Sequence, residues 1–221
     1  MKITPYGKDV VLRMFVITIL LDAVAFFIPN LIAKIILVVL SIILFGFTLY
    51  FFRDPLRKLT GNEKEEDLIS PADGKVVLIE EVEYKGDYFT PGEKLTQISI
   101  FLSPLNVHVN YIPLTGMVDY LKYIPGDYLV AFDHKSSERN ERTEIGITSK
   151  SGKRVLFKQI AGFVARRIVY TIKEGDEVFA GEKFGMIKFG SRTDIIFKNA
   201  VSINVKVGDK VVAGETIIAE L

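Results

Sequence analysis

The feature that most restricts the fold is a run of 22 mainly apolar residues, 31–52, which carries a single charge, Lys34, near its start. At about 1.5 Å per residue, a helix of this length crosses a hydrocarbon core of about 30 Å. The run is too long for a signal peptide and is followed by Arg53, Arg57 and Lys58 instead of a small-residue cleavage site. The small domain that remains cannot bury such a helix. The run therefore predicts a transmembrane helix.

A second apolar segment, residues 14–28, precedes this run and contains Asp22. Pro29-Asn30 between the two segments is a turn signal, so the pair predicts a helical hairpin whose first arm, residues 10–28, is marginal for spanning a bilayer. Basic residues lie on both outer flanks of the pair. The positive-inside rule then places both ends on the cytoplasmic face of the cell (inner) membrane.

The composition of the chain excludes several classes of function. The chain has 221 residues, enough for one ordinary domain and an accessory segment. A net charge of +1 gives no field that would attract nucleic acid. The absence of cysteine excludes disulfides, thiolate zinc sites and a cysteine nucleophile, and we predict no bound metal.

Residues 59–221 have the pattern of one β-rich domain. Short runs rich in β-branched and aromatic residues are separated by Gly, Pro and Asp, at residues 76–84, 97–102, 107–112, 154–160 and 167–172. Residues 128–141 have a weak helical period. We therefore expect an α+β, mainly β chain, with a membrane anchor over 1–58 and a β-rich domain over 59–221, which would carry any catalytic site.

The C-terminal third contains an internal repeat. Residues 174–185 recur as residues 207–218, a spacing of 33 residues. The Gly-Asp and Ala-Gly-Glu turns in each copy predict a short hairpin, and two copies predict a pseudo-symmetric sandwich resembling the biotinyl and lipoyl carrier domains. The modified lysine of those domains, at an exposed turn between two hydrophobic residues, is missing, because Met186-Ile187-Lys188 has a different order. The repeat predicts a carrier-like barrel-sandwich fold without carrier function.

Few side chains are candidates for chemistry. The two histidines are His108, in an apolar β run, and His134, in a polar stretch. Asp73 lies in a Ser-Pro-Ala-Asp-Gly turn signature, and Gly190-Ser191 is a common dipeptide. Each of these residues, taken alone, is typical of an ordinary structural position.

Their combination is more specific. Behind a membrane segment that ends in FFRDP, the chain contains in order SPADGKV, FLSPLNVHVNYIP, NER, AGFVARRI and GEKFGMIKFGSRTDIIF. This set resembles the short form of phosphatidylserine decarboxylase proenzymes, and the resemblance extends from the membrane segments to Leu221.

The resemblance implies a proenzyme that cuts itself. The Ser191 hydroxyl would attack the Gly190 carbonyl and end as a covalent pyruvoyl group, leaving chains 1–190 (β chain) and 191–221 (α chain) associated non-covalently. A serine hydroxyl needs a base, and the family pattern assigns this role to Asp73 and a histidine, here His108. Longer relatives carry a second histidine three residues on, where this chain has Tyr111. Whether His108 serves self-cleavage, decarboxylation or both therefore stays open.

The resemblance also implies the reaction. The pyruvoyl ketone condenses with the serine amine of phosphatidylserine and accepts the electrons released with carbon dioxide, which yields phosphatidylethanolamine. His108 is the candidate acid that protonates the product. Arg166-Arg167 is a candidate binding site for the lipid phosphate, because a guanidinium matches the geometry of a phosphate. The equally supported alternative is that the two arginines are an ordinary solvated pair at the end of a strand. The partners implied are the lipid substrate and the bilayer.

Three alternatives remain at this point. The same chemistry would serve an ether-linked serine lipid (archaetidylserine), because the reaction touches only the head group. A membrane-tethered carrier-like binding module without catalysis would leave the context of Ser191, Asp73 and His108 unexplained. An inactive relative is disfavoured because all three processing residues are present. The sequence assigns no role to Asn140-Glu141-Arg142 and leaves a homo-oligomer open.

Overall fold

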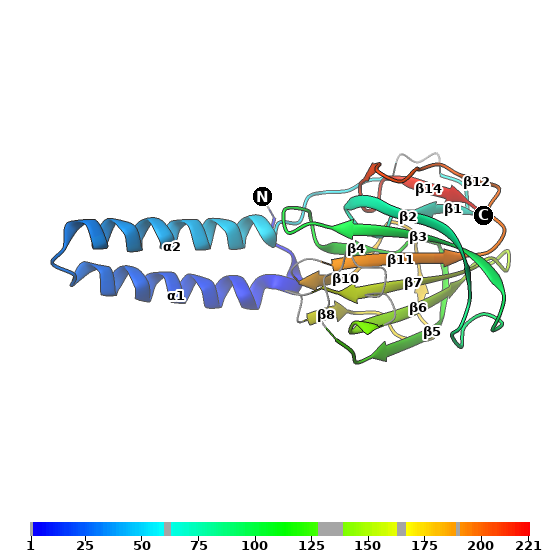
Figure 1. Ribbon diagram of the computed structural model, residues 1–221, viewed down its shortest axis with the longest axis horizontal. Coiled ribbons are helices and arrows are strands. Elements are labelled where there is room, and N and C mark those ends of the chain that lie inside the picture. Colours follow the sequence, from blue (N-terminus) through cyan, green and yellow to red (C-terminus); the bar gives the residue numbers. More distant parts are fainter. Residues whose placement is uncertain (1, 60–62, 128–138, 163–166, 189–190) are drawn as a thin grey trace. The chain divides into compact units, whose positions relative to one another are not determined.

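A computed structural model describes residues 2–59, 63–127, 139–162, 167–188 and 191–221. The chain divides into two compact units, Met1–Pro55 and Leu56–Leu221. The first unit is helical, and the second consists of strands (Figure 1). The mainly β character predicted from the sequence is confirmed.

The helical unit is built from a short 3-10 helix, η1 (Pro5–Gly7), and two helices, α1 (Lys8–Phe26) and α2 (Leu31–Phe51). The two long helices run side by side in opposite directions (Figure 1), and the rings of Phe15 and Phe45 lie 5.7 Å apart between them. Among the described residues, only α2 is long and apolar enough to cross a membrane. The apolar run is therefore a single helix, and its insertion in a bilayer remains a prediction.

Local hydrogen bonds explain where α2 begins and how the unit closes. The Asn30 side chain accepts a hydrogen bond from the Ala33 backbone N–H at 3.0 Å, which satisfies one of the free donors at the start of the helix. At the other end, the Asp54 N–H donates to the Lys2 carbonyl at 2.7 Å. The N-terminal residues thus pair with the segment that follows α2.

The described residues of the strand unit form three antiparallel sheets. The largest has the order β13-β2-β3-β11-β7-β6-β5-β9. Its strands are β13 (Lys210–Val211), β2 (Gly74–Glu83), β3 (Lys94–Leu102), β11 (Ser191–Phe197), β7 (Arg154–Ala161), β6 (Arg142–Thr148), β5 (Gly116–Ile124) and β9 (Glu177–Val178). The two smaller sheets are β1 (Asp67–Ile69), β14 (Ile217–Glu220) and β12 (Ser202–Ile203), and β4 (Val109–Tyr111), β10 (Lys183–Lys188) and β8 (Arg167–Tyr170).

Each of the five runs predicted as strands contains a strand, namely β2, β3, β4, β7 and β8. The sequence interpretation missed β1, β5, β6, β11 and β12. In β11 every residue is buried although the strand begins Ser-Arg-Thr-Asp, a composition more typical of a loop. Most of the segment with a weak helical period, residues 128–138, lies outside the described residues.

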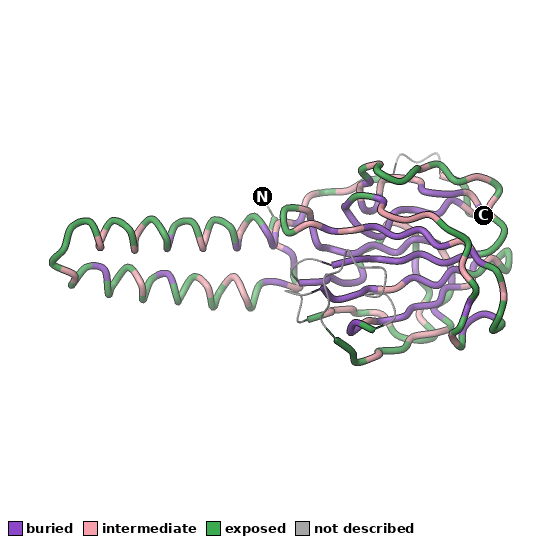
Figure 2. Tube along the Cα trace, viewed as in Figure 1, coloured by how far each residue is buried: buried purple, intermediate pink, exposed green. Residues whose placement is uncertain are grey.

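Buried residues run along most strands of the large sheet (Figure 2), and apolar side chains form separate clusters on its two faces. Side chains alternate along a strand, so Ile195 and Phe197 of β11 join the main core on the inner face, whereas Ile196 packs in an aromatic cluster on the outer face. The same alternation places the Ser191 side chain on the inner face.

The internal repeat is present, but its predicted hairpins are wrong. The first copy forms β9 and β10, and the second forms β13 and β14. The two strands of each copy pair with different sheets: β9 and β13 are opposite edges of the large sheet, whereas β10 and β14 are each the middle strand of a small one. The turns form, with φ of +79° at Gly181 and +71° at Gly214. In each copy of the repeat, the chain therefore passes from the large sheet to a small one. The pairing partner of each strand is selected by tertiary packing and not by the local turn.

Candidate functional site

Ser191 is the first residue of β11, in the interior of the large sheet. It pairs with Leu102 of β3 on one side and with Ala161 of β7 on the other. The residue is fully buried, and its hydroxyl oxygen has no hydrogen-bond partner among the described residues. A buried hydroxyl without a partner is costly and uncommon, which makes this serine a candidate for chemistry.

The strand register brings the Asp73 turn to the same end of the sheet. Lys75 of β2 pairs with Phe101 of β3, so the preceding Gly74 lies beside Leu102 and on one row with Ser191. A side chain at Gly74 would place its Cβ 2.3 Å from the Phe101 carbonyl oxygen, so this row needs glycine. Two strand spacings, roughly 10 Å, separate the backbone of Gly74 from that of Ser191, and Asp73 directly precedes Gly74. Asp73 and Ser191 thus belong to strands that are not neighbours, because β3 lies between them.

The segment that carries His108 is hydrogen-bonded to both regions. His108 is fully buried and directly precedes β4, and by strand alternation its side chain extends to the same side as that of Asn110. The Asn110 amide donates to the Pro71 carbonyl at 3.3 Å and accepts from the Gln159 amide at 2.9 Å. Gln159 pairs with Thr193 of β11. Asn110 thus links the turn of Asp73 to the strands beside Ser191.

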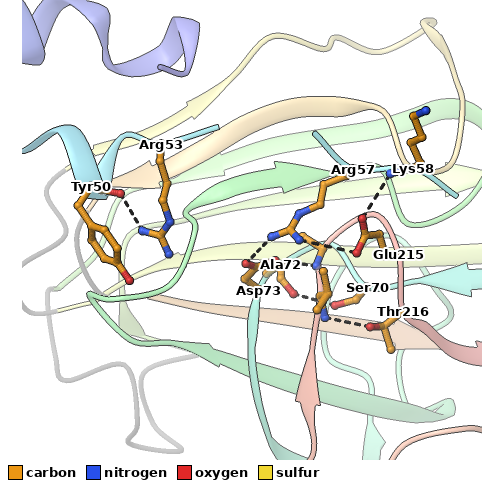
Figure 3. A network of polar contacts seen from close by, with 11 residues as sticks. Tyr50, Arg53, Arg57, Lys58, Ser70, Ala72, Asp73, Glu215 and Thr216 are labelled. Carbon is orange, nitrogen blue, oxygen red and sulfur yellow. Dashed lines mark hydrogen bonds and ion pairs between the residues drawn. The ribbon is translucent and has the colours of Figure 1, made fainter. Parts of the chain in front are cut away.

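Both carboxylate oxygens of Asp73 have partners (Figure 3). One accepts a hydrogen bond from the Ala213 N–H at 2.8 Å, and the other forms an ion pair with the Arg57 guanidinium at 2.8 Å. Arg57 also lies 3.7 Å from the Glu215 carboxylate. The turn that carries Asp73 is thereby fixed to both the start and the end of the strand unit.

Asp73 has a counterpart in the other half of the repeat. The segment Pro113-Leu114-Thr115-Gly116 enters β5 as Pro71-Ala72-Asp73-Gly74 enters β2, and each glycine pairs with the equivalent strand, β9 or β13. The Thr115 hydroxyl accepts from the Ala180 N–H at 3.0 Å, just as Asp73 accepts from Ala213. A hydroxyl is therefore sufficient for the structural task. What Asp73 adds is a negative charge.

Asn140 and Glu141 hold the strand beside Ser191. The fully buried Asn140 amide donates to the Ala161 carbonyl at 2.7 Å, and the Glu141 carbonyl accepts from the Ala161 N–H at 2.9 Å. Ala161 is the residue paired with Ser191. The Asn-Glu-Arg motif, unexplained by the sequence, thus supports the row that contains the serine, a role that only the fold shows.

Arg192 anchors the start of β11 from the outer face. Its side chain is 2% exposed, and its guanidinium contacts the Asp194 carboxylate at 2.6 Å and the Ser99 hydroxyl at 2.7 Å. The sequence interpretation missed this residue because an arginine in a polar run is normally exposed. Its burial fixes the residue that follows Ser191.

A cavity of about 500 Å³ lies on the outer face beside Arg192 and Glu144. Burial opposes ionisation of Glu144, but Lys158 and Arg142 outweigh it and lower the pKa of the carboxyl. The cations that line the cavity near Glu144 are thus already paired with it. This arrangement stabilises the sheet behind Ser191 and offers no obvious ligand chemistry.

The structure does not describe every predicted residue. Gly190, Arg166 and His134 lie outside the described residues. Arg167 is exposed at the start of β8, where it pairs with Lys188 at the end of β10. Ser191, Asp73 and the His108 segment converge on one end of the sheet, and this convergence defines the candidate site.

Comparison with known proteins gives the family. The model of the phosphatidylserine decarboxylase family matches residues 44–219. The chain belongs to the phosphatidylserine decarboxylase family. A phosphatidylserine decarboxylase proenzyme from Chlorobium limicola is 46% identical over 220 residues, covering 98% of this chain and 99% of the relative. Such proenzymes from Prosthecochloris aestuarii and Amoebophilus asiaticus are 47% and 52% identical, covering 98% and 78% of this chain and 96% and 75% of the relatives.

Membership in this family of decarboxylases, which are lyases, confirms the resemblance found in the sequence. The matched span includes Asp73, His108 and Ser191. The relatives are named proenzymes, that is, precursors. A carrier-like binding module is thereby disfavoured.

Proposed function

We propose that this chain decarboxylates phosphatidylserine to phosphatidylethanolamine after it cleaves itself between Gly190 and Ser191 and converts Ser191 to a pyruvoyl group. The observation that carries the proposal is the fully buried Ser191 hydroxyl, without a described hydrogen-bond partner, at the start of an interior strand. This position fits a group that must be shielded from water. The family name supports the substrate.

Self-cleavage would begin with the Ser191 oxygen attacking the Gly190 carbonyl carbon, which replaces the peptide bond by an ester and frees the amino group of Ser191. A base would then remove the Cα proton of residue 191 as the ester oxygen leaves Cβ, which frees Gly190 as a carboxylate and leaves an enamine. Addition of water to the imine tautomer of this enamine would release ammonia and leave the ketone of the pyruvoyl group. A base must take the hydroxyl proton. Because β3 lies between β11, which begins with Ser191, and β2, which follows Asp73, His108 is the proposed direct acceptor, with Asp73 acting through it.

The pyruvoyl group supplies an electron sink for the departing carbon dioxide. The residues of this chain would position the substrate and move protons. His108, buried in the segment between Asp73 and Ser191, is the proposed donor of the proton that replaces the carboxylate. The burial of the whole row excludes water from this step.

The topology supports two chains that stay together after cleavage. The proposed fragment 191–221 contains β11, which pairs along its whole length with β3 and β7 of the other fragment. It also contains β14, which pairs with β1 of the other fragment. Non-covalent association would therefore hold the cut enzyme together.

The apolar helix α2 supports membrane attachment. We propose that the strand unit lies on the cytoplasmic side of the cell membrane, where basic flanking residues favour it. An ether-linked serine lipid shares the same head group and would react in the same way.

The proposal is tested by the intact mass of the purified full chain. The expected result is two species, one matching residues 1–190 and one matching residues 191–221 with pyruvoyl in place of serine. Ser191→Ala should give one uncut chain without activity. Thr193→Ala is the matched control, because Thr193 is also a buried hydroxyl without a described partner on the same strand face.

Cleavage should persist in the Thr193→Ala variant. An uncut chain that still releases carbon dioxide from phosphatidylserine vesicles would contradict the pyruvoyl mechanism. A cut chain that releases none would contradict the proposed substrate, and parallel vesicles of ether-linked serine lipid would then identify the alternative.

A further inference from the structure

Next to the row of Ser191, the strand unit presents apolar and basic side chains to solvent. Leu102, the partner of Ser191, is the last residue of β3, and the chain then makes a turn over Ser103–Asn106 before it reaches His108. In this turn the Ser103 N–H and hydroxyl both donate to the Asn106 side chain at 2.8 Å. The turn is therefore well fixed, yet it holds Leu105 outward with 63% of its surface exposed.

Two further segments connect to this row, one through the ion pair of Asp73 and the other through the chain that leads to Ser191. Arg57 is bound to Asp73 beside the row, and its neighbours Leu56 and Lys58 are exposed, Leu56 by 79%. Arg167 is exposed opposite Lys188, three residues before Ser191. We name this surface, made of Leu56, Lys58, Leu105 and Arg167, the Leu105 edge.

The acidic side chains that contact Arg57 and Lys58 already form ion pairs or hydrogen bonds with them. Asp73 is paired with Arg57, and Glu215 contacts both Arg57 and the Lys58 N–H. The exposed charges of the Leu105 edge are therefore positive. A rigid apolar tip beside exposed cations is the pattern by which a protein surface enters the head-group layer of an anionic membrane.

We propose that the Leu105 edge contacts an anionic lipid bilayer, with Leu105 inserted among the head groups at the entrance of the Ser191 site. This contact is separate from the apolar helix α2. It places the bilayer surface next to the row where the head group must react, so a lipid would move into the site without passing through water. This consequence for catalysis rests on the proposed function, whereas the contact itself does not.

The opposite end of β11 provides a matched control. Val201 follows that end, is 74% exposed and keeps its backbone N–H bonded to the Glu220 carbonyl at 2.7 Å. Six residues of strand, roughly 20 Å, separate the two ends of β11. Leu105 and Val201 are thus similar in exposure and differ in location.

The contact is tested by site-specific labelling of the full chain. Because the chain has no cysteine, Leu105→Cys and Val201→Cys each give a single labelling site. Both variants also carry Ser191→Ala, so that the result does not depend on self-cleavage. Each cysteine is labelled with an environment-sensitive fluorophore. The labelled chains are reconstituted in phosphatidylcholine vesicles that contain phosphatidylglycerol and a nitroxide-bearing lipid. The label at 105 should be quenched by the nitroxide lipid, and the label at 201 should not. Equal or absent quenching at 105 would overturn the proposal.

The catalytic consequence is tested by presenting the serine lipid in two forms, in vesicles and as a short-chain monomer in solution. Leu105→Asp should lower kcat/KM for vesicles about fivefold or more, since an exposed leucine that becomes buried changes an equilibrium by roughly that factor. It should leave kcat/KM for the monomer unchanged, and Val201→Asp should change neither value. Equal loss on both substrates would overturn insertion, because it would place Leu105 in the site itself, and no loss on vesicles would overturn a role in access.

Discussion

Substitution of Asp73 by threonine should separate its structural task from its chemical one. The Asp73 carboxylate accepts from the buried Ala213 N–H at 2.8 Å and pairs with Arg57. Thr115 performs the equivalent task in the other half of the repeat with a hydroxyl alone. Asp73→Thr should therefore retain the bond to the Ala213 N–H, whereas Asp73→Ala should lose it. Both variants lose the ion pair, so the difference between them isolates the hydrogen bond.

The magnitude follows from the burial of Ala213, which is fully enclosed. Leaving a buried N–H without an acceptor costs about 1–3 kcal/mol. For a unit of this size, a loss of about 2 kcal/mol lowers Tm by roughly 4–8 °C. We expect Asp73→Ala to melt lower than Asp73→Thr by about this amount, measured by circular dichroism on the full chain in detergent, with both in a Ser191→Ala background so that every sample is a single chain.

The rate of self-cleavage should fall in Asp73→Thr even though its stability is largely kept. If the carboxylate of Asp73 assists proton removal from Ser191, its loss slows cleavage by about 100-fold or more even when the fold is intact. Asp73→Thr with the native Ser191 should then stay uncut for much longer than the unmodified chain in a time course of intact mass. Cleavage of Asp73→Thr at the unmodified rate would refute the chemical role and leave Asp73 as a turn residue. Equal melting of the threonine and alanine variants would refute the structural equivalence with Thr115.

Two further predictions concern buried polar groups. Arg192→Met should lower the free energy of unfolding by about 3–5 kcal/mol, because it leaves the Asp194 charge buried without its partner. The double variant with Asp194→Leu should recover most of that loss. Thermal unfolding checks both values, and a double variant as unstable as the single one would contradict the prediction. Burial raises the pKa of Tyr88 to about 12 and also raises the pKa values of Tyr84 and Tyr120. The stability that the neutral form of Tyr88 contributes is therefore complete below about pH 10 and is lost as the pH rises through 12. Ultraviolet titration of Tyr88→Phe should lack the last-ionising component of the unmodified chain, and an unchanged titration curve would contradict the assignment.

Local patterns in the sequence were sufficient for several features. The apolar run of residues 31–52 predicted α2, because helix length and hydrophobicity are properties of a contiguous segment. Five β-rich runs predicted strands for the same reason. The ordered motifs identified the family, which the comparisons confirm. Turn glycines such as Gly181 and Gly214 were also correctly placed, since a positive φ is a local requirement.

Strand partners and register were decided by the tertiary structure. The repeat predicted hairpins, but β9 and β10 join different sheets because packing of the whole unit selects their partners. The row that aligns Gly74 with Ser191 depends on β3 lying between β2 and β11, and no local pattern reports which strands become neighbours.

The environment of single side chains was likewise outside the reach of the sequence. Arg192 and Asn140 look like exposed polar residues in the chain, yet both are buried, one bonded to Asp194 and Ser99 and the other to the Ala161 carbonyl. By itself the sequence determined the apolar helix α2, the family and the candidate residues. The tertiary structure alone decided their convergence, because burial and hydrogen-bond partners arise from contacts between segments that are far apart in the chain.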